Sequence, residues 1–172
     1  MNSNISIVQG DITQANTDAI VNAANQKMLG GGGVDGAIHR AAGPELLEYC
    51  KQLPAVDSVR CPVGEARITP AGQLPARWVI HTVGPRYMID PEPANLLTSA
   101  YRNSLTLAVK HQCKSIAFPA ISCGVFGYPY SEAAEISLAI CRDARWHGIN
   151  ISFYLSSPKL VKIWQMELNR LA

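Results

Sequence analysis

The chain has 172 residues, of which 48% are hydrophobic and 16% charged, and this length is enough to bury one substantial core. Its 15 Lys and Arg against 13 Asp and Glu give a formal net charge of +2, which excludes a strong bulk attraction to nucleic acid or membrane. The five cysteines are scattered and form no C-x-x-C pair, so we expect reduced thiols. The sequence has no signal-like start and no apolar run long enough to span a membrane. We therefore expect one cytoplasmic domain over residues 1–172.

Short β-branched runs alternate along the chain with longer segments of helical spacing, which is typical of an α/β sandwich. Strands are expected at 5–8, 19–24, 67–69, 78–83, 115–120 and 149–155, and helices at 35–53, 94–111, 129–147 and 158–171. In the second of these helices Leu97, Tyr101, Leu105 and Ala108 recur at every third or fourth position, so one face packs on the sheet. The pattern predicts helices covering a sheet, without an internal repeat.

Two glycine-bearing loops each follow an expected strand and precede an expected helix. The first runs from Asn22 through the four glycines at 30–33 and Asp35 to Gly36, and the second runs from Pro119 to Pro129. Glycines let backbone N–H groups approach an anion, and the helix start that follows adds a positive partial charge. Either loop alone could be an ordinary tight turn. Two of them at the carboxyl ends of neighbouring strands favour a diphosphate held from both sides.

The familiar nucleotide-binding motifs and metal motifs do not occur. The glycine run lacks the Gly-Lys-Ser/Thr ending of a P-loop, and no acidic residue ends a strand about twenty residues later as in a dinucleotide fingerprint. Neither an NTPase nor a dehydrogenase is supported. His39, His81, His111 and His147 lie far apart in sequence, so a structural role is expected for each, and neither a metal nor a cofactor is expected.

Four polar side chains stand close to the ends of expected strands and to the start of an expected helix. Asn22 and Asn25 flank two alanines directly after an apolar strand, and Asp35 opens the helix beyond the glycines. Asp11 follows the first strand. From the residues alone, Asp35 is best explained as a complement to the helix dipole and Asp11 as part of an Asx turn. A functional role stays open for both.

Five motifs, in order along nearly the whole chain, resemble macrodomains of the MacroD type, and specifically the bacterial O-acetyl-ADP-ribose deacetylases. They are VQGDIT at 8–13, IVNAAN at 20–25, GGGVDGAIH at 31–39, VIHTVGP at 79–85 and AFPAISCGVFGYP at 117–129. The resemblance implies a three-layer α/β/α sandwich with a mixed central sheet and a cleft for ADP-ribose. It also implies a hydrolase that removes the acetyl group from O-acetyl-ADP-ribose, or cleaves mono-ADP-ribose esters from protein Asp or Glu, by attack of water.

The same resemblance implies roles for individual residues. Asp35 positions or deprotonates the attacking water and Asn25 orients the distal ribose, so these two are the catalytic candidates and Asp35 gains a role beyond the helix dipole. Asp11 accepts a hydrogen bond from the adenine amino group beside Ile12. The other ligand-binding candidates are Asn22, Gly31, Gly32, Gly33, Val34, Ser122, Cys123, Gly124, Val125 and Phe126.

The chain departs from the family pattern at two of its candidate positions and at one position in the last expected strand. Phe126 stands where close bacterial relatives often carry tyrosine, and Cys123 where the family usually has threonine; no base is placed to make Cys123 a nucleophile. Ser156 falls where an aromatic residue is expected to pack on adenine, and Phe153 or Tyr154 could substitute for it.

The expected partners follow from the same reasoning. They are ADP-ribose and O-acetyl-ADP-ribose, with ADP-ribosylated proteins as a further substrate class, and the protein is expected to be a monomer. An alternative is a non-catalytic ADP-ribose reader, but such a module has no need of a water-activating carboxylate beside Asn25. A third reading, an RNA-binding protein, is disfavoured because a phosphate-backbone site usually shows as a basic patch.

Overall fold

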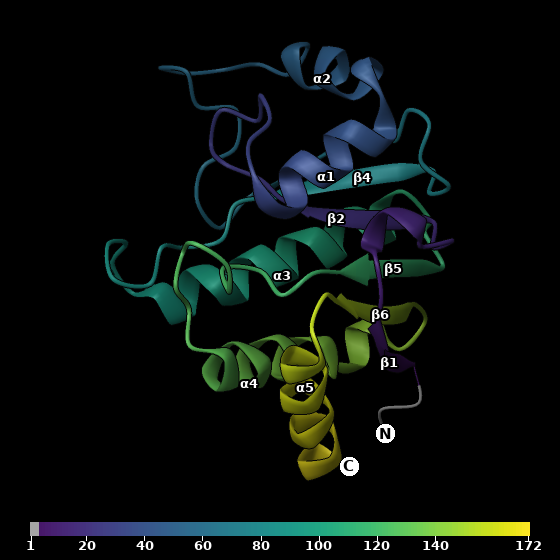
Figure 1. The fold of residues 1–172 in the computed structure, drawn as a ribbon, viewed down its shortest axis with the longest axis vertical. Helices are drawn as coiled ribbons and strands as arrows, with labels where there is room; N and C mark the ends of the chain where they lie inside the picture. The colour runs from purple at the N-terminus through teal and green to yellow at the C-terminus, as the bar shows by residue number, and fades with distance from the viewer. Residues whose placement is uncertain (1–3) are drawn as a thin grey trace.

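The computed structural model describes residues 4–172 and contains one six-stranded mixed sheet (Figure 1). The strand order is β1-β6-β5-β2-β4-β3, and every neighbouring pair is parallel except β3 and β4. The strands are β1 (Ile5–Gln9), β2 (Ala19–Ala23), β3 (Ala66–Pro70), β4 (Trp78–Thr82), β5 (Ser115–Phe118) and β6 (Asn150–Leu155). All six predicted strands are therefore present, with ends that differ by one or two residues.

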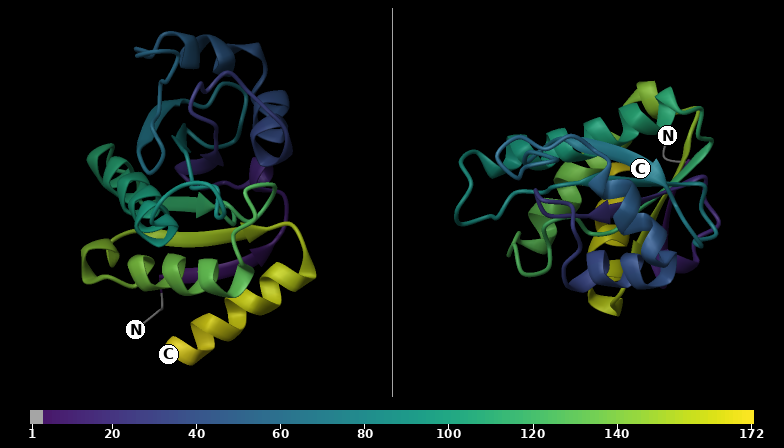
Figure 2. Two further views of the ribbon diagram at one scale, coloured as in Figure 1. Left: turned by 90° about the vertical axis from the view of Figure 1, so that its left-hand side faces the viewer. Right: turned by 90° about the horizontal axis from the view of Figure 1, so that it is seen from above.

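Helices cover both faces of this sheet. They are α1 (Gly33–Ala42), α2 (Pro44–Lys51), α3 (Pro93–Lys110), α4 (Tyr130–Cys141) and α5 (Pro158–Leu171), with short 3-10 turns η1 (Ile12–Gln14) and η2 (Ala144–Trp146). In Figure 1, α1 and α2 lie at the top of the molecule and α4 and α5 at the bottom, and Figure 2 shows the same separation from the side. The predicted three-layer α/β/α sandwich with a mixed sheet is confirmed.

Alternate residues of the central strands point into two separate cores. Val21 and Ile80 pack with α3, α4 and α5, whereas Ile20 and Val79 pack with α1 and α2. Because side chains of a strand alternate between the two faces, Asn22 lies on the same face as Ile20, toward α1. The sequence thus places a polar side chain at the end of a buried strand, directly under the helix that starts after the glycine run.

Two predicted helices are shorter than expected. The single helix predicted over 35–53 is wrong: the chain breaks at Gly43, whose φ of 82° lies in the left-handed region, and Pro44 starts α2. The helix predicted over 129–147 ends at Cys141, and the segment after it forms η2, which Asp143 caps through Arg145 N. In both places the helix ends at a local cap or break, although the helical spacing of apolar residues continues further along the sequence.

The five cysteines are all free thiols buried in the fold. Among the helices of residues 4–172, none is both long enough and apolar enough to cross a membrane.

Candidate active site

Both glycine loops lie at the carboxyl edge of the parallel strands. The first follows β2 and the second follows β5, and these strands are paired in the sheet. Gly84, just after β4, allows the second loop to pass close to it, since an added methyl group would lie 2.5 Å from Ile121 Cγ2 and would overlap Ser122 Oγ. The prediction that the loops follow neighbouring strands is confirmed, and the loop ends after β2, β4 and β5 gather at one place.

Asp35 occupies the first turn of α1 and is 4% exposed. Its Oδ1 accepts a hydrogen bond from Asn22 Nδ2 at 2.8 Å, and His39 Nε2, one turn further along α1, lies 3.4 Å from the same oxygen. Asn22 is itself fully buried at the end of β2. The strand and the helix therefore hold one carboxylate oxygen from two sides.

Burial raises the pKa of Asp35 above its ordinary value, while the hydrogen bond from Asn22 and the charge of His39 oppose that rise. A raised pKa makes the carboxylate a stronger base than an exposed aspartate. It also brings the pKa of the group closer to neutral pH, which is the direction that general-base catalysis requires.

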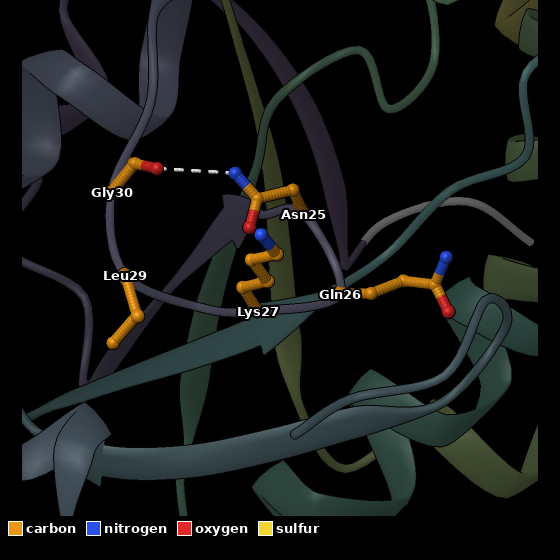
Figure 3. A pocket seen from close by; sticks show the side chains of 5 residues that line it. All are labelled: Asn25, Gln26, Lys27, Leu29 and Gly30. Carbon is orange, nitrogen blue, oxygen red and sulfur yellow. Dashed lines mark hydrogen bonds between the residues drawn. The ribbon is translucent and has the colours of Figure 1, made fainter. Parts of the chain in front are cut away.

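Asn25 and the second Asp35 oxygen converge on Gly31. A methyl group added at Gly31 would lie 3.1 Å from Asp35 Oδ2 and 3.3 Å from Asn25 Nδ2. Figure 3 shows Asn25 Nδ2 donating to Gly30 O at 3.1 Å, and Asn25 Oδ1 accepts from Met28 N at 3.1 Å, so the amide braces its own loop. The two catalytic candidates are thus brought together across the glycine run, as the sequence resemblance implies.

A hollow of about 320 Å³ lies beside Asn25 and is lined by Asn25, Gln26, Lys27, Leu29 and Gly30. It belongs to the first loop alone, and residues 122–126 do not line it. In Figure 3 the Gln26 side chain extends away from that of Asn25. Of the candidate site residues, only Asn25 borders this hollow.

The second loop combines backbone strain with buried polar atoms. Ser122 has a φ of 68°, uncommon for a residue with a side chain, and within residues 4–172 its buried Oγ has no hydrogen-bond partner. Burial raises the pKa of Cys123 to about 12, so its thiol is protonated at neutral pH and is a poor nucleophile. Val125 is fully exposed, and Phe126 O accepts from Tyr87 N at 2.9 Å, which ties this loop to the segment after β4.

The predicted adenine end lies beside α1. Asp11 Oδ1 accepts hydrogen bonds from Thr13 N at 2.9 Å and Thr13 Oγ1 at 2.7 Å, which forms the expected Asx-type cap of η1 and leaves Oδ2 outside both bonds. Ile12 is buried in the core under α1, where Val34 and Tyr154 pack against the same cluster. Phe153 points into the opposite core, so of the two proposed substitutes for an aromatic at 156 only Tyr154 lies on this face.

Ser156 is exposed directly after β6, which allows a direct test of the missing aromatic. We expect Ser156→Tyr to tighten ADP-ribose binding by ~0.5–1.5 kcal/mol, the range of an aromatic pair. Calorimetry on the variant and the original protein measures this. Unchanged or weaker binding by a folded Ser156→Tyr variant would mean that Tyr154 already supplies the adenine contact.

Two residues of this site were not predicted from the sequence. His39 was expected to be structural but lies beside Asp35, and His81 was expected to be structural but contacts Asn22, with Nδ1 3.2 Å from Asn22 Nδ2. The signal for His39 was its spacing, because residues four apart share one helix face. For His81 the signal was a polar ring that follows the three apolar residues at 78–80 in a buried strand.

No group of three His, Cys, Asp or Glu side chains in the described chain, residues 4–172, is placed to hold a metal ion.

The fold and these paired loops define an α/β sandwich with a polar site at the carboxyl edge of its sheet. The chain belongs to the Macro domain family, whose model matches residues 21–137. It is 57% identical to a macro domain-containing protein of Vibrio parahaemolyticus over 96% of this chain and 98% of that protein. It is also 56% identical to an O-acetyl-ADP-ribose deacetylase of Salmonella newport over 83% of this chain and 80% of that protein.

Solved structures agree with this assignment. The macrodomain of Oceanobacillus iheyensis with ADP matches with a TM-score of 0.90 at 45% identity, covering 96% of this chain and 90% of that one. The predicted family is therefore confirmed by sequence and by fold.

Proposed function

We propose that this protein binds ADP-ribose and hydrolyses esters on its distal ribose, with O-acetyl-ADP-ribose as a substrate. The observation that carries the proposal is the Asp35 carboxylate, which is buried, held at Oδ1 by Asn22, and directed at Oδ2 toward Gly31 beside Asn25. The likeness to proteins named O-acetyl-ADP-ribose deacetylases supports the same choice of substrate.

The reaction needs only groups that this site offers. A water molecule gives a proton to Asp35 Oδ2 while its oxygen bonds to the acyl carbon. The bond between the acyl carbon and the ribose oxygen then breaks, and Asp35 returns the proton to that oxygen, which gives ADP-ribose, the free acid and the original carboxylate. Asn25 orients the ribose hydroxyls, and the backbone N–H groups of Gly31–Val34 and Ser122–Phe126 hold the diphosphate from two sides. Asp11 Oδ2 and the Ile12 backbone meet the adenine edge.

Esters of ADP-ribose on protein Asp or Glu are a second proposed substrate class, because the bond that breaks is the same. Exposed apolar side chains stand beside the second loop: Val125 is fully exposed, and Met88 and Ile89 are 87% and 68% exposed. They belong to segments joined by the hydrogen bond from Tyr87 N to Phe126 O. Such a rim offers contact to a polypeptide, whereas an acetyl group would not reach it.

The alternative is a reader that binds ADP-ribose without turnover. Burying Asp35 raises its pKa and costs folding free energy, and recognition of ADP-ribose alone does not require a carboxylate of raised pKa. The site therefore favours catalysis over recognition alone.

One experiment separates these functions. We expect the purified protein to release ADP-ribose from O-acetyl-ADP-ribose, and calorimetry to show tighter binding of ADP-ribose than of AMP, which lacks the second phosphate and the distal ribose. A parallel incubation with protein carrying ADP-ribose on Asp or Glu tests the second substrate class. Binding of ADP-ribose with no release from either substrate would leave the reader as the function.

A further inference from the structure

A chain of buried polar groups runs from Asp35 into the sheet. Asn22 Nδ2 donates to Asp35 Oδ1 at 2.8 Å and lies 3.2 Å from His81 Nδ1, and His81 Nε2 lies 3.0 Å from Thr69 Oγ1. Asn22, His81 and Thr69 come from the three adjacent strands β2, β4 and β3. All four residues are at least 95% buried. Burying so many polar groups in place of apolar ones brings little stability, so a different role has to be sought.

The donors and acceptors in this chain fit together in only one way. The carboxylate Asp35 accepts, so the Asn22 amide must turn its NH₂ group toward it. The second N–H of that group then faces His81 Nδ1, which must accept and so carry no proton. His81 Nε2 then carries the proton and donates to Thr69 Oγ1. The NH₂ group of Asn22 is thus held by two acceptors, Asp35 Oδ1 and the bare Nδ1 of His81.

Burial also keeps this imidazole neutral. Desolvation, with a smaller effect of the His39 charge, lowers the pKa of His81 to about 3, so the ring stays uncharged at physiological pH. Cys50 Sγ, 3.8 Å from His81 Nε2, is a neutral neighbour because burial raises its pKa to about 11. The hydrogen-bond pattern therefore does not switch with pH in the working range.

We propose that His81 is a positioning residue that acts through Asn22 to hold Asp35 Oδ1, so that Oδ2 faces Gly31 and the ligand. This inference rests on the proposed function, in which Asp35 is the base. Without an acceptor at Nδ1, the second N–H of Asn22 loses its partner, and the amide is free to rotate out of its bond to Asp35 Oδ1. Apart from the hydrogen-bonded residues Asn22, His81 and Thr69, the titratable groups among residues 4–172 that act on Asp35 are His39 of α1 and Cys50 of α2. The test leaves both of these residues in place.

The test replaces His81 in two ways. His81→Leu removes the acceptor, and His81→Asn keeps a carbonyl oxygen close to the position of Nδ1. We expect His81→Leu to lower kcat on O-acetyl-ADP-ribose on the order of 10- to 100-fold, with ADP-ribose affinity nearly unchanged. The acid limb of its pH–kcat profile should move to higher pH, because loss of the Asn22 bond removes an influence that lowers the pKa of Asp35. His81→Asn should restore most of kcat and return the acid limb.

A matched control lies on the next residue of the same strand. Thr82 is fully buried on the opposite face of β4, and its Oγ1 donates to Glu65 O at 2.8 Å and lies 3.5 Å from Ala100 O. Thr82→Val therefore removes hydrogen bonding that does not involve Asp35, Asn22, His81 or Thr69. It should lower the melting temperature without moving the acid limb. A folded His81→Leu protein with the original kcat and acid limb would overturn the proposal.

Two further measurements do not depend on activity, and the first of them needs no variant. The ¹⁵N shifts of His81 should show a proton on Nε2 and no titration between about pH 5 and 8; a proton on Nδ1 would refute the inference. The Asp35 carboxyl ¹³C titration should shift to higher pH in His81→Leu. If the protein hydrolyses neither substrate, these shifts still test the positioning of Asp35, so failure of the proposed function is distinguishable from failure of this inference.

Discussion

Replacing Asp35 with alanine is expected to lower the single-turnover rate on O-acetyl-ADP-ribose on the order of 10²–10⁴-fold, the usual contribution of a positioned general base. ADP-ribose should still bind, because the diphosphate is held by the backbone of the two loops. The physical reason is the geometry at α1, where Oδ1 is held by Asn22 and Oδ2 faces Gly31. Rates and calorimetric affinities measured on the same folded variant give the result.

The competing explanation of Asp35 predicts something different. If it only complements the dipole of α1, its removal should cost about 1 kcal/mol of stability or less and leave turnover nearly intact. Asp35→Asn is the matched control, since the amide keeps an oxygen for the Asn22 bond but cannot take a proton from water. Near-original rates for both variants would defeat the mechanism and leave the fold assignment standing.

The pH dependence of the original protein belongs to the same test. A base works only when deprotonated, so kcat should fall as pH drops through the pKa of Asp35. Because burial raises that pKa, the fall should begin at a higher pH than for an exposed aspartate.

The Asn25→Ala variant should also slow turnover by misplacing the ribose. The double variant with Asp35→Ala should lose less turnover than the product of the two single fold-losses, since both residues act on one step.

The sequence predicted the elements well where periodicity and local chemistry agreed. The six strands were found from short runs of β-branched and apolar residues, and the helix over 158–171 begins at Pro158 after the Ser157 cap. It failed at 35–53, where the apolar spacing runs through Gly43 and Pro44 although both residues mark a break. The prediction followed the apolar spacing, whereas the break at Gly43 and Pro44 determines where α1 ends and α2 begins.

The candidate site shows a different limit. The pairing of Asn25 with Asp35 across the glycine run was predicted from a family resemblance, and the structure brings the two side chains to Gly31. The contact of Asn22 with His81 depends on strands β2 and β4 being adjacent in register, and no local pattern encodes a pairing across 59 residues. The sequence showed that polar residues lie in largely apolar strands, but it did not show which residues they contact.

Gly36 allows a second change with a large expected effect. A methyl group added at Gly36 would lie 2.6 Å from the backbone oxygen of Gly31 and 3.1 Å from Arg40 Nη1. Since a backbone atom cannot turn aside as a side chain can, Gly36→Ala must displace the glycine run from α1. Gly31 is the residue on which Asn25 and Asp35 converge, so this displacement reaches the proposed reaction centre directly.

We therefore expect Gly36→Ala to weaken ADP-ribose binding by about tenfold or more, and turnover further, because it moves the backbone that holds the phosphates. Overpacking should lower stability by ~1–3 kcal/mol, more than the ~0.5–1 kcal/mol that alanine adds over glycine inside a helix. Calorimetry and thermal melting measure the two effects. Gly148→Ala is the control, since nothing lies within 4 Å of a methyl group there, and it should change neither. If a folded Gly36→Ala protein bound ADP-ribose as tightly as the original, α1 would have moved instead of the loop, and the close contact of Gly31 with Gly36 would not set the geometry of the site.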